Sequence, residues 1–452
     1  MPSPASAPAA RPTRSALLTL GRLPVALEIA RALHAHGWRV VVAEPLAWHL
    51  CRLSRAVACC RVVTAPTTDA GRYAEELLAI VREERISLVV PVLEETLYVA
   101  ALHGRLPAGV TLACPRPEAL RELHDKWRFA ALARELGLTV PDTALADSEA
   151  GARIAGEGPH VIKPRLSCAG IGVTLTDRGA ALPAALRRDA YVVQRRLPGA
   201  PCCAFAFARA GGVRTLVVYR SLLEAGSVSV TFERIPTPDD VAGFVATLVE
   251  ARGASGMLAF DFIADANGRY HAIECNPRAT SGLHLLAPRT IVAGLLPETL
   301  SDGEGSLRDI DSGVAPVGTR RQEFWSALGE LEWRTLRGRC RREEWRRLFT
   351  TRDVDWSAVD RKPFLLMTLV NAPLLWRAIR ARRPITEVAV EDMVWGEAAA
   401  SEADGRVTST VGGDRSDTAS ADAGDAAGDV EGAKTAGEKT GAGASPSAAT
   451  GR

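Results

Sequence analysis

The most informative part of the chain runs from residue 257 to residue 276: MLAFDFIA (257–264), DANG (265–268) and RYHAIECN (269–276). Two β-rich runs flank the dipeptide Asn267–Gly268, and Asn-Gly between such runs predicts a tight β-hairpin. If these two residues form the turn, Asp261 on the first strand lies directly opposite Glu274 on the second. Alternation along the second strand puts Asn276 on the same face as Glu274.

This pairing is unfavourable unless something lies between the two acids. Two carboxylates facing each other, roughly 5 Å apart at Cβ, repel one another and weaken the sheet. A divalent cation such as Mg²⁺ removes that repulsion, because it prefers oxygen ligands and shares them with phosphates. The hairpin therefore predicts a magnesium–nucleotide site on one face, and a core face formed by Phe260, Phe262, Ile273 and Cys275. The alternative is an amphipathic hairpin whose acidic side chains simply face water.

The composition is that of an ordinary folded protein. The 452 residues are 47% hydrophobic and 24% charged, with a net charge of +2. This length accommodates several domains, and the near-neutral charge gives no reason to expect nucleic acid or a membrane as a partner. The nine cysteines are scattered without a C-x-x-C, and the eight histidines show no ligand spacing. We therefore expect reduced thiols in a cytoplasmic protein, with neither a disulfide framework nor a zinc site.

The N-terminal part alternates β-rich runs with helical patterns. The runs are at 15–20, 39–43, 61–63 and 88–92, and the helical patterns are at 23–37 and 70–84. This order predicts an α/β domain with a parallel sheet. Gly21 stands alone after the first run, so the G-x-G-x-x-G dinucleotide motif is absent. Glu94 and Glu95 follow the fourth run, where α/β sheets bind ligands, but we favour solvated loop charges for both.

The rest of the chain divides into recognisable segments. Residues 120–136 predict one helix, ended by Gly137, and β segments with glycine-rich turns follow residue 147. Residues 1–14 have no apolar core and residues 398–452 have almost no large apolar residue, so they predict a disordered leader and a disordered tail. The apolar run 364–376 is too short for a bilayer, which needs about 20 residues, and predicts a buried helix with no transmembrane segment.

Lysine is rare, and one lysine precedes a loop suited to phosphate. Only five of the 55 basic residues are lysines, at positions 126, 163, 362, 434 and 439. Lys163 ends a β-rich run, and a small-residue loop with Gly170 and Gly172 follows it. Glycines let backbone amides approach phosphates closely, and a nearby lysine neutralises their charge. The loop is not a P-loop, because no Gly-Lys-Ser/Thr opens a helix.

Taken in order, these motifs resemble the ATP-grasp superfamily, which includes biotin carboxylase, D-alanine–D-alanine ligase and the large subunit of carbamoyl-phosphate synthetase. The resemblance covers about residues 120–286 and rests on Lys126, Lys163 with its glycine loop, QRRLPG at 194–199, Asp261, and ECNPR at 274–278. It implies a Rossmann-like domain at 15–118, a two-subdomain ATP-grasp fold at 119–300 and a mostly helical region at 301–397. The motifs at 355–356, 362–364 and 391–397 are similar to the ends of mycosporine-glycine synthetases.

The resemblance also implies residue roles on the phosphate side of the site. Lys126 and Lys163 would contact the ATP phosphates. The loop with Ser167, Gly170 and Gly172 would close over them and exclude water.

The resemblance implies three further groups of roles. The adenine slot would be lined by Val193, Gln194, Arg195 and Leu197. Mg²⁺ or Mn²⁺ would be held by Asp261 and Glu274, with Asn276 as an additional ligand. Arg278, next to the transferred phosphoryl group or the acceptor carboxylate, would stabilise developing charge together with Lys163 as the catalytic groups. Gln194 and Asp261 stand where glutamate is commoner in the family.

The implied activity is a ligase reaction. A small-molecule carboxylate or enolic acid would receive the γ-phosphoryl group of ATP and then react with an amine such as an amino acid. The partners would be these two small molecules, and neither their identity nor the oligomeric state follows from the sequence. The alternative is an ATP-binding homologue without catalysis.

One basic segment allows a different function. Residues 334–347 hold many arginines, which could bind nucleic acid or an anionic membrane surface. The interleaved Leu336, Trp345 and Leu348 suit an amphipathic helix packed on the protein. We therefore expect a solvated basic face and no nucleic-acid partner.

Overall fold

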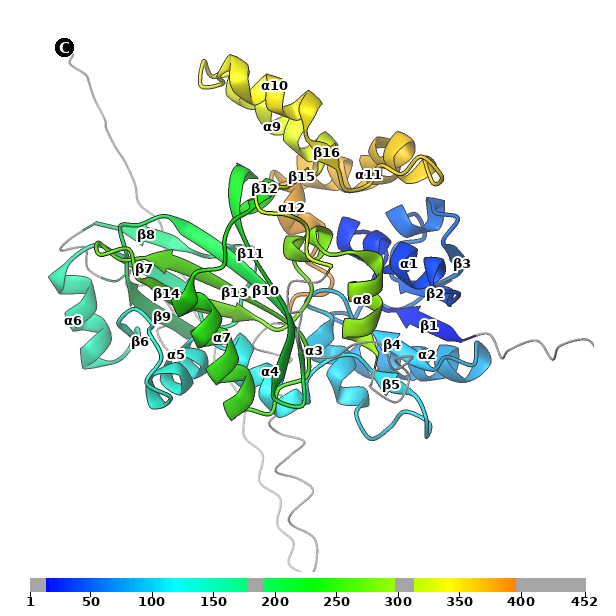
Figure 1. Cartoon of the computed structure of the whole chain (residues 1–452), viewed down its shortest axis with the longest axis horizontal. Coiled ribbons are helices and arrows are strands. Elements are labelled where there is room, and N and C mark those ends of the chain that lie inside the picture. Colours follow the sequence, from blue (N-terminus) through cyan, green and yellow to red (C-terminus); the bar gives the residue numbers. More distant parts are fainter. Residues whose placement is uncertain (1–13, 169, 178–181, 183–189, 297–312, 396–452) are drawn as a thin grey trace, which may run out of the picture. The chain divides into compact units, whose positions relative to one another are not determined.

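The computed structural model describes residues 14–168, 170–177, 182, 190–296 and 313–395 (Figure 1). The expected leader, up to residue 13, and the expected tail lie outside the described residues. The strands of the described residues form three sheets.

The strands are β1 (Ser15–Leu18), β2 (Arg39–Glu44), β3 (Val57–Val62), β4 (Leu88–Val90), β5 (Thr111–Leu112), β6 (Thr143–Leu145), β7 (His160–Pro164), β8 (Thr174–Thr176), β9 (Tyr191–Arg195), β10 (Pro201–Arg209), β11 (Gly212–Ala225), β12 (Val228–Arg234), β13 (Gly256–Ala264), β14 (Tyr270–Asn276), β15 (Arg320–Gln322) and β16 (Arg352–Asp353). The α-helices are α1 (Pro24–Ala35), α2 (Ala70–Glu83), α3 (Thr96–Val99), α4 (Pro117–His124), α5 (Lys126–Glu135), α6 (Glu149–Glu157), α7 (Asp239–Ala251), α8 (Pro288–Leu295), α9 (Phe324–Leu336), α10 (Arg342–Thr350), α11 (Lys362–Ala381) and α12 (Ile385–Val388). The 3₁₀ helices are η1 (Leu50–Leu53), η2 (Ala100–Leu102) and η4 (Ser281–Leu285).

The N-terminal sheet is parallel, as the alternation of runs predicts. Its strand order is β3-β2-β1-β4-β5. Alternate side chains serve two cores: Leu18, Val40 and Val42 pack with α1, whereas Leu17 and Val41 pack with α2. Both faces of the sheet are therefore buried, as is usual for a parallel sheet with helical crossovers.

The prediction of a single helix at 120–136 is wrong, because the helix is interrupted at Asp125. The Asp125 carboxylate accepts hydrogen bonds from the backbone N–H groups of Trp127 and Arg128, which makes it the N-cap of a second helix, α5. The apolar periodicity continues across the break and hides this cap. Gly137, at φ +69°, ends α5 as expected. The break places Lys126 at the first position of α5.

The hairpin β13–β14 has the predicted central pair but a different turn. Asp261 pairs with Glu274, whereas Phe262 pairs with Ala272, so Ile273 is an extra residue in a β-bulge. At the tip, the backbone N–H of Asp265 donates to the carbonyl of Arg269, which leaves a loop one residue longer than an Asn-Gly turn. The loop is one residue longer than predicted, and the bulge adds one residue to β14. The two shifts cancel, so Asp261 pairs with Glu274 as predicted.

Because of the bulge, the core face of the hairpin differs from the predicted one. Phe260, Phe262 and Cys275 lie in the apolar cluster beneath the hairpin, as predicted. Ala272 joins them there, whereas Ile273 does not, because the bulge turns it out of the alternation. The prediction that Ile273 points into the core is wrong.

The hairpin belongs to a seven-stranded sheet of order β14-β13-β10-β11-β12-β15-β16. Its strands are antiparallel except for the β15–β16 pair, which is parallel. A separate four-stranded antiparallel sheet has the order β6-β9-β7-β8. Figure 1 shows this smaller sheet beside the β13–β14 hairpin.

The C-terminal helices expose more apolar surface than expected. The apolar run at 364–376 lies in α11, but Leu369 and Ile379 are each 68% exposed, so the prediction of a buried helix is wrong. By length and composition α11 is the one described helix that could cross a membrane, which on its own is weak support for a span.

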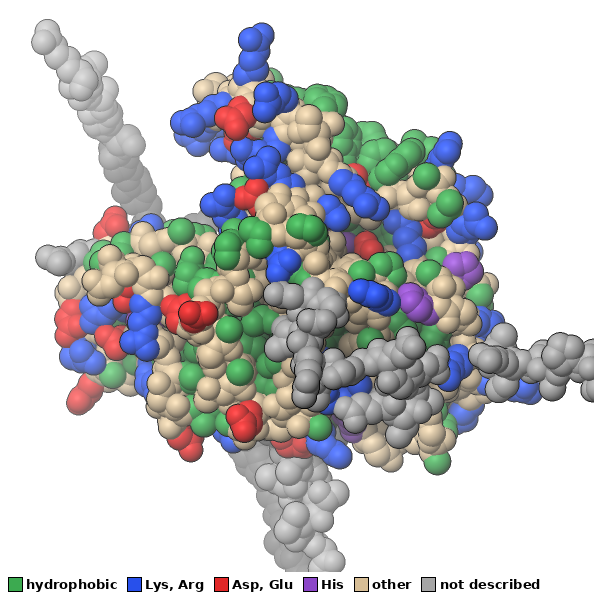
Figure 2. Space-filling view, viewed as in Figure 1, with side chains coloured by type: hydrophobic (Ala, Val, Ile, Leu, Met, Phe, Trp, Pro, Cys, Tyr) green, Lys and Arg blue, Asp and Glu red, His purple; other side chains and the backbone are tan. Residues whose placement is uncertain are grey.

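Leu348 is buried as expected from a packed basic segment, whereas Leu336 is exposed and the segment divides between α9 and α10. Figure 2 shows Lys and Arg side chains gathered over α9 and α10.

Candidate functional site

Four charged side chains from four elements meet in one place. Lys126 begins α5, Lys163 lies on β7, and Asp261 and Glu274 face each other on β13 and β14. The Nζ atom of Lys126 lies 3.7 Å from Oε2 of Glu274, and both lysines are 5% exposed. We call these four residues the charged cluster.

The charges in the cluster control each other's ionisation. Burial lowers the pKa of Lys163 to about 8, although the charge on Glu274 opposes this shift. Burial and the charge on Glu274 both raise the pKa of Asp261. Burial also opposes ionisation of Glu274, but the charges on Lys126 and Lys163 outweigh it and lower its pKa. Glu274 is therefore the carboxylate that neutralises the lysines, and Asp261 has the weaker hold on its charge.

Asn276 connects the acid pair to Arg278. Its side-chain N–H₂ donates to Oδ2 of Asp261 at 3.1 Å and to Oε1 of Glu274 at 3.5 Å. Its carbonyl oxygen accepts from Arg278 at 3.5 Å. The amide therefore directs its N–H₂ group toward the acids. To act as a metal ligand, it would have to rotate so that its oxygen faces them.

Arg278 is held by a residue that the sequence interpretation placed in solvent. The Nε atom of Arg278 donates to Oε1 of Glu94 at 2.6 Å, and Nε2 of His124 lies 3.5 Å from the other oxygen of Glu94. Burial opposes ionisation of Glu94, but the charges of His124 and Arg278 lower its pKa. Glu94 and Glu95 are both buried, so the expectation of solvated loop charges is wrong. Glu94 and its partner are 184 positions apart, and no local sequence signal could reveal their pairing.

Glu95 has a structural role at the same loop. Its carboxylate accepts from the backbone N–H groups of Val92 and Leu93 and from the hydroxyl of Thr19. It therefore fixes the end of β4, from which Glu94 reaches Arg278.

The glycine loop adjoins the charged cluster through Ser167. Lys126 donates to the carbonyl oxygen of Ser167 at 2.9 Å and to its hydroxyl at 3.2 Å. Gly170 and Gly172 have φ +68° and +74°, which favour glycine. A Cβ at Gly172 would approach Pro164 to 2.7 Å, so this loop turns tightly against the end of β7.

The residues expected around adenine lie on β9 and directly after it. Gln194 is buried and donates to the Thr143 hydroxyl at 3.0 Å and to the Ile273 carbonyl at 3.4 Å. The side chain of Val193 packs in an apolar cluster, and the Arg195 guanidinium is ion-paired on the surface. Leu197 is half-buried in the following loop. Contacts from Val193 and Arg195 to a base would therefore involve backbone atoms.

The donor set fits Mg²⁺ shared with a polyphosphate. Among the described residues no group of three or more His, Cys, Asp or Glu is arranged as a metal site. Mg²⁺, however, is commonly held by one or two carboxylates and completes its octahedron with water and phosphate oxygens. Asp261 and Glu274 provide two such carboxylates on one face, with two lysines beside them for phosphate charge.

The described fold is shared with several solved structures. The biotin carboxylase domain of Hydrogenobacter thermophilus 2-oxoglutarate carboxylase matches with TM-score 0.51 and 17% identity over 62% of this chain and 69% of that one. Biotin carboxylase from Campylobacter jejuni matches with TM-score 0.51 and 15% identity over 63% and 71%. An L-amino acid ligase from Bacillus licheniformis matches with TM-score 0.51 and 16% identity over 66% and 78%. At these identities the similarity shows the fold alone.

The sequence comparison defines the central domain. No curated protein is similar enough in sequence to count as a match. The family model of the ATP-grasp domain, however, matches residues 123–282, the segment that supplies all four members of the charged cluster together with Asn276 and Arg278. Residues 123–282 of this chain are therefore an ATP-grasp domain.

Proposed function

We propose that this protein is an ATP-dependent ligase that activates a small-molecule carboxylate or enolic acid and couples it to an amine. The observation that carries the proposal is the convergence of Lys126, Lys163, Asp261 and Glu274 within an ATP-grasp domain. The two lysines would neutralise the phosphates, and the two acids would hold Mg²⁺ or Mn²⁺. The metal would polarise the phosphate oxygens that it binds.

The proposed reaction needs no nucleophile from the protein. A carboxylate oxygen of the substrate attacks the γ-phosphorus of ATP, and ADP leaves. The amine nitrogen then attacks the acyl carbon, phosphate leaves with the bonding electrons, and the amine proton passes to solvent. Positioning and charge neutralisation dominate such transfers. Arg278, fixed by Glu94, would stabilise charge on the transferred group.

The setting of the reaction follows from the same proposal. The substrates would be a small acid and a small amine, and the L-amino acid ligase among the solved structures makes amino acids the first compounds to test. All nine cysteines are unpaired, which suits a cytoplasmic protein.

The deciding experiment measures ADP release with Mg²⁺ over pairs of amino acids and small carboxylates. We expect release that requires both an acid and an amine. Lys163→Ala and Glu274→Ala should each lower the rate about a hundredfold or more, because each removes a charge that acts on the transferred phosphoryl group. Lys362→Ala, at the exposed start of α11, is the matched control and should keep the full rate.

Two outcomes would contradict the proposal in different ways. Full activity in both cluster variants would remove the site assignment. Calorimetric binding of MgATP without ADP release under any acid–amine pair would instead indicate the non-catalytic homologue.

A further inference from the structure

A second like-charged pair lies at the far edge of the seven-stranded sheet. Arg321 on β15 and Arg352 on β16 are direct strand partners. Paired residues present their side chains to the same face, and like charges placed opposite one another destabilise a sheet. Neither arginine forms an ion pair with a carboxylate of the described residues, and the only hydrogen bond that the Arg321 guanidinium donates to them goes to the backbone oxygen of Arg320.

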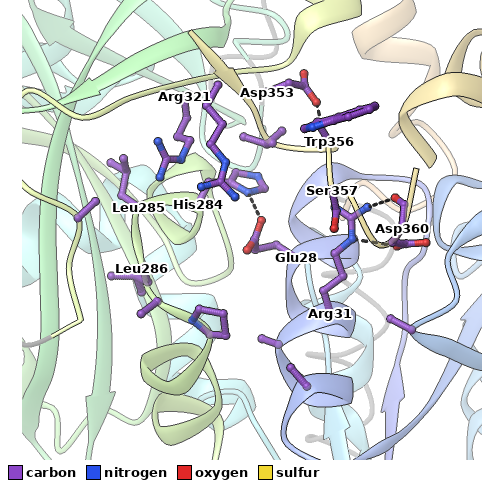
Figure 3. A pocket seen from close by; sticks show the side chains of 18 of the residues that line it. Glu28, Arg31, His284, Leu285, Leu286, Arg321, Asp353, Trp356, Ser357 and Asp360 are labelled. Atoms are coloured by element: carbon purple, nitrogen blue, oxygen red, sulfur yellow. Dashed lines mark hydrogen bonds and ion pairs between the residues drawn. The ribbon is translucent and has the colours of Figure 1, made fainter. Parts of the chain in front are cut away.

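Both arginines line a cavity with a volume of about 800 Å³. The cavity lies between α1, the segment from η4 to α8, and the β15–β16 edge (Figure 3). No member of the charged cluster lines it. Its volume is within the range of roughly 300–1,000 Å³ that is usual for small-molecule sites.

The acids that line the cavity are already used by other partners. Glu28 is 3.3 Å from Nδ1 of His284, and Asp360 binds Arg31 at 3.0 Å. Figure 3 shows Glu28 and His284 directed toward one another, and Arg31 directed to Asp360.

Asp353 is the third acid of the cavity lining. Its carboxylate accepts from the backbone N–H groups of Phe324, Asp355 and Trp356.

Burial and the charge of Arg352 lower the pKa of Arg321, although Glu28 opposes this shift. Arg55, a third arginine of the lining, donates to the carbonyl of Val359 and forms no ion pair with a described carboxylate either, so three cations of the cavity have no matching anion.

Part of the remaining wall is apolar and aromatic. It includes Leu285, Leu286, Val314 and the ring of Trp356. A bound molecule would therefore contact charge at one end and hydrocarbon along its body, the usual division in a specific small-molecule site.

We propose that this cavity binds a small organic anion, with a carboxylate or phosphate group between Arg321 and Arg352 and an apolar or aromatic body against Leu285 and Trp356. Guanidinium groups suit both anions, because their N–H donors match the paired oxygens. The inference goes beyond the ligase reaction and does not depend on ATP chemistry, since the site is separate from the charged cluster.

The test is calorimetric titration of the full chain at low ionic strength and without nucleotide. The three probes share a phenyl ring. Benzoate and phenyl phosphate carry the two head groups, and benzamide is the neutral counterpart. We expect at least one anion to bind saturably and benzamide not to bind. Stronger binding of phenyl phosphate or of benzoate identifies the preferred head group.

Variants locate the binding. Arg321→Gln and Arg352→Gln should each weaken the anion at least tenfold, whereas Arg342→Gln, an exposed arginine outside the cavity, should not. Lys163→Ala should retain binding, because it alters only the charged cluster. Arg352→Gln should unfold cooperatively, and the anion should raise its melting temperature less than it raises that of the wild type.

Several results would overturn the inference. These are no saturable binding of either anion, equal binding by the wild type and both cavity variants, or benzamide binding as tightly as benzoate. Loss of phenyl phosphate binding in Lys163→Ala, with retention in Arg352→Gln, would place the anion at the phosphate lysines and equally reject the cavity. Failure of the ligase proposal would leave these measurements unaffected.

Discussion

Two like-charged cross-strand pairs lie toward opposite edges of one sheet, and the protein treats them differently. Asp261 and Glu274 on β13–β14 have two buried lysines beside them. Arg321 and Arg352 on β15–β16 have no carboxylate of the described residues in an ion pair with them. The acid pair is thus partly balanced within the protein, whereas the arginine pair is not. A like-charged pair indicates that a counterion is missing. The charged side chains beside the pair indicate whether that counterion is bound together with further charged groups.

Removal of the charge on Asp261 should have a large effect on activity. Asp261→Asn keeps the shape and the hydrogen-bonding partners but leaves one carboxylate for the metal. We expect ADP release to fall about a hundredfold or more. Asp239→Asn, an exposed aspartate at the start of α7, is the control and should retain activity. A fully active Asp261→Asn would mean that the acid pair does not hold the metal.

A second measurement separates the two acids by stability. Glu274→Gln should lower the free energy of unfolding by about 3 kcal/mol, because it leaves Lys126 and Lys163 buried without their counterion. Asp261→Asn should cost little or stabilise the protein, because it removes the repulsion. Urea unfolding without Mg²⁺ and nucleotide measures both values. Equal losses would show that the lysines do not distinguish the two acids.

The smallest expected effect concerns the arginine pair. Arg352→Gln removes a like charge from the β15–β16 edge and should raise the free energy of unfolding by about 0.5 kcal/mol in buffer free of small organic anions. Added NaCl should reduce this gain, because it screens the repulsion between exposed charges. The test is urea unfolding at low and high salt beside Arg342→Gln. A destabilised Arg352→Gln would show that the arginine is satisfied within the protein.

The sequence predicted the acid pair because its determinants are local. The two strands are joined by a short loop, so few registers are available, and the β-rich runs with Asn267–Gly268 identify the hairpin. The turn itself was wrong by one residue, and the bulge at Ile273 restored the predicted pairing of Asp261 with Glu274. The parallel N-terminal sheet was predicted for the same reason, since its rhythm is repeated along adjacent segments.

Other features could not be read from neighbouring residues. The burial of Glu94 depends on Arg278, and the pairing of Arg321 with Arg352 depends on how α9 and α10 fold between them. The exposure of α11 depends on which of its faces finds a partner in the fold. These features arise from tertiary packing, to which periodicity is insensitive.

The Glu94–Arg278 ion pair has a consequence for motion. The backbone N–H of Ala279 also donates to the carbonyl of Val92, so two adjacent bonds join the loop after β4 to the segment after β14. We therefore expect the parallel sheet and the seven-stranded sheet to move together at this junction. The Nζ atom of Lys163, by contrast, donates no hydrogen bond to another described residue. We expect the motion that opens and closes the proposed nucleotide site to lie in the four-stranded sheet, which carries Lys163, and to break the hydrogen bond from Gln194 to the Ile273 carbonyl.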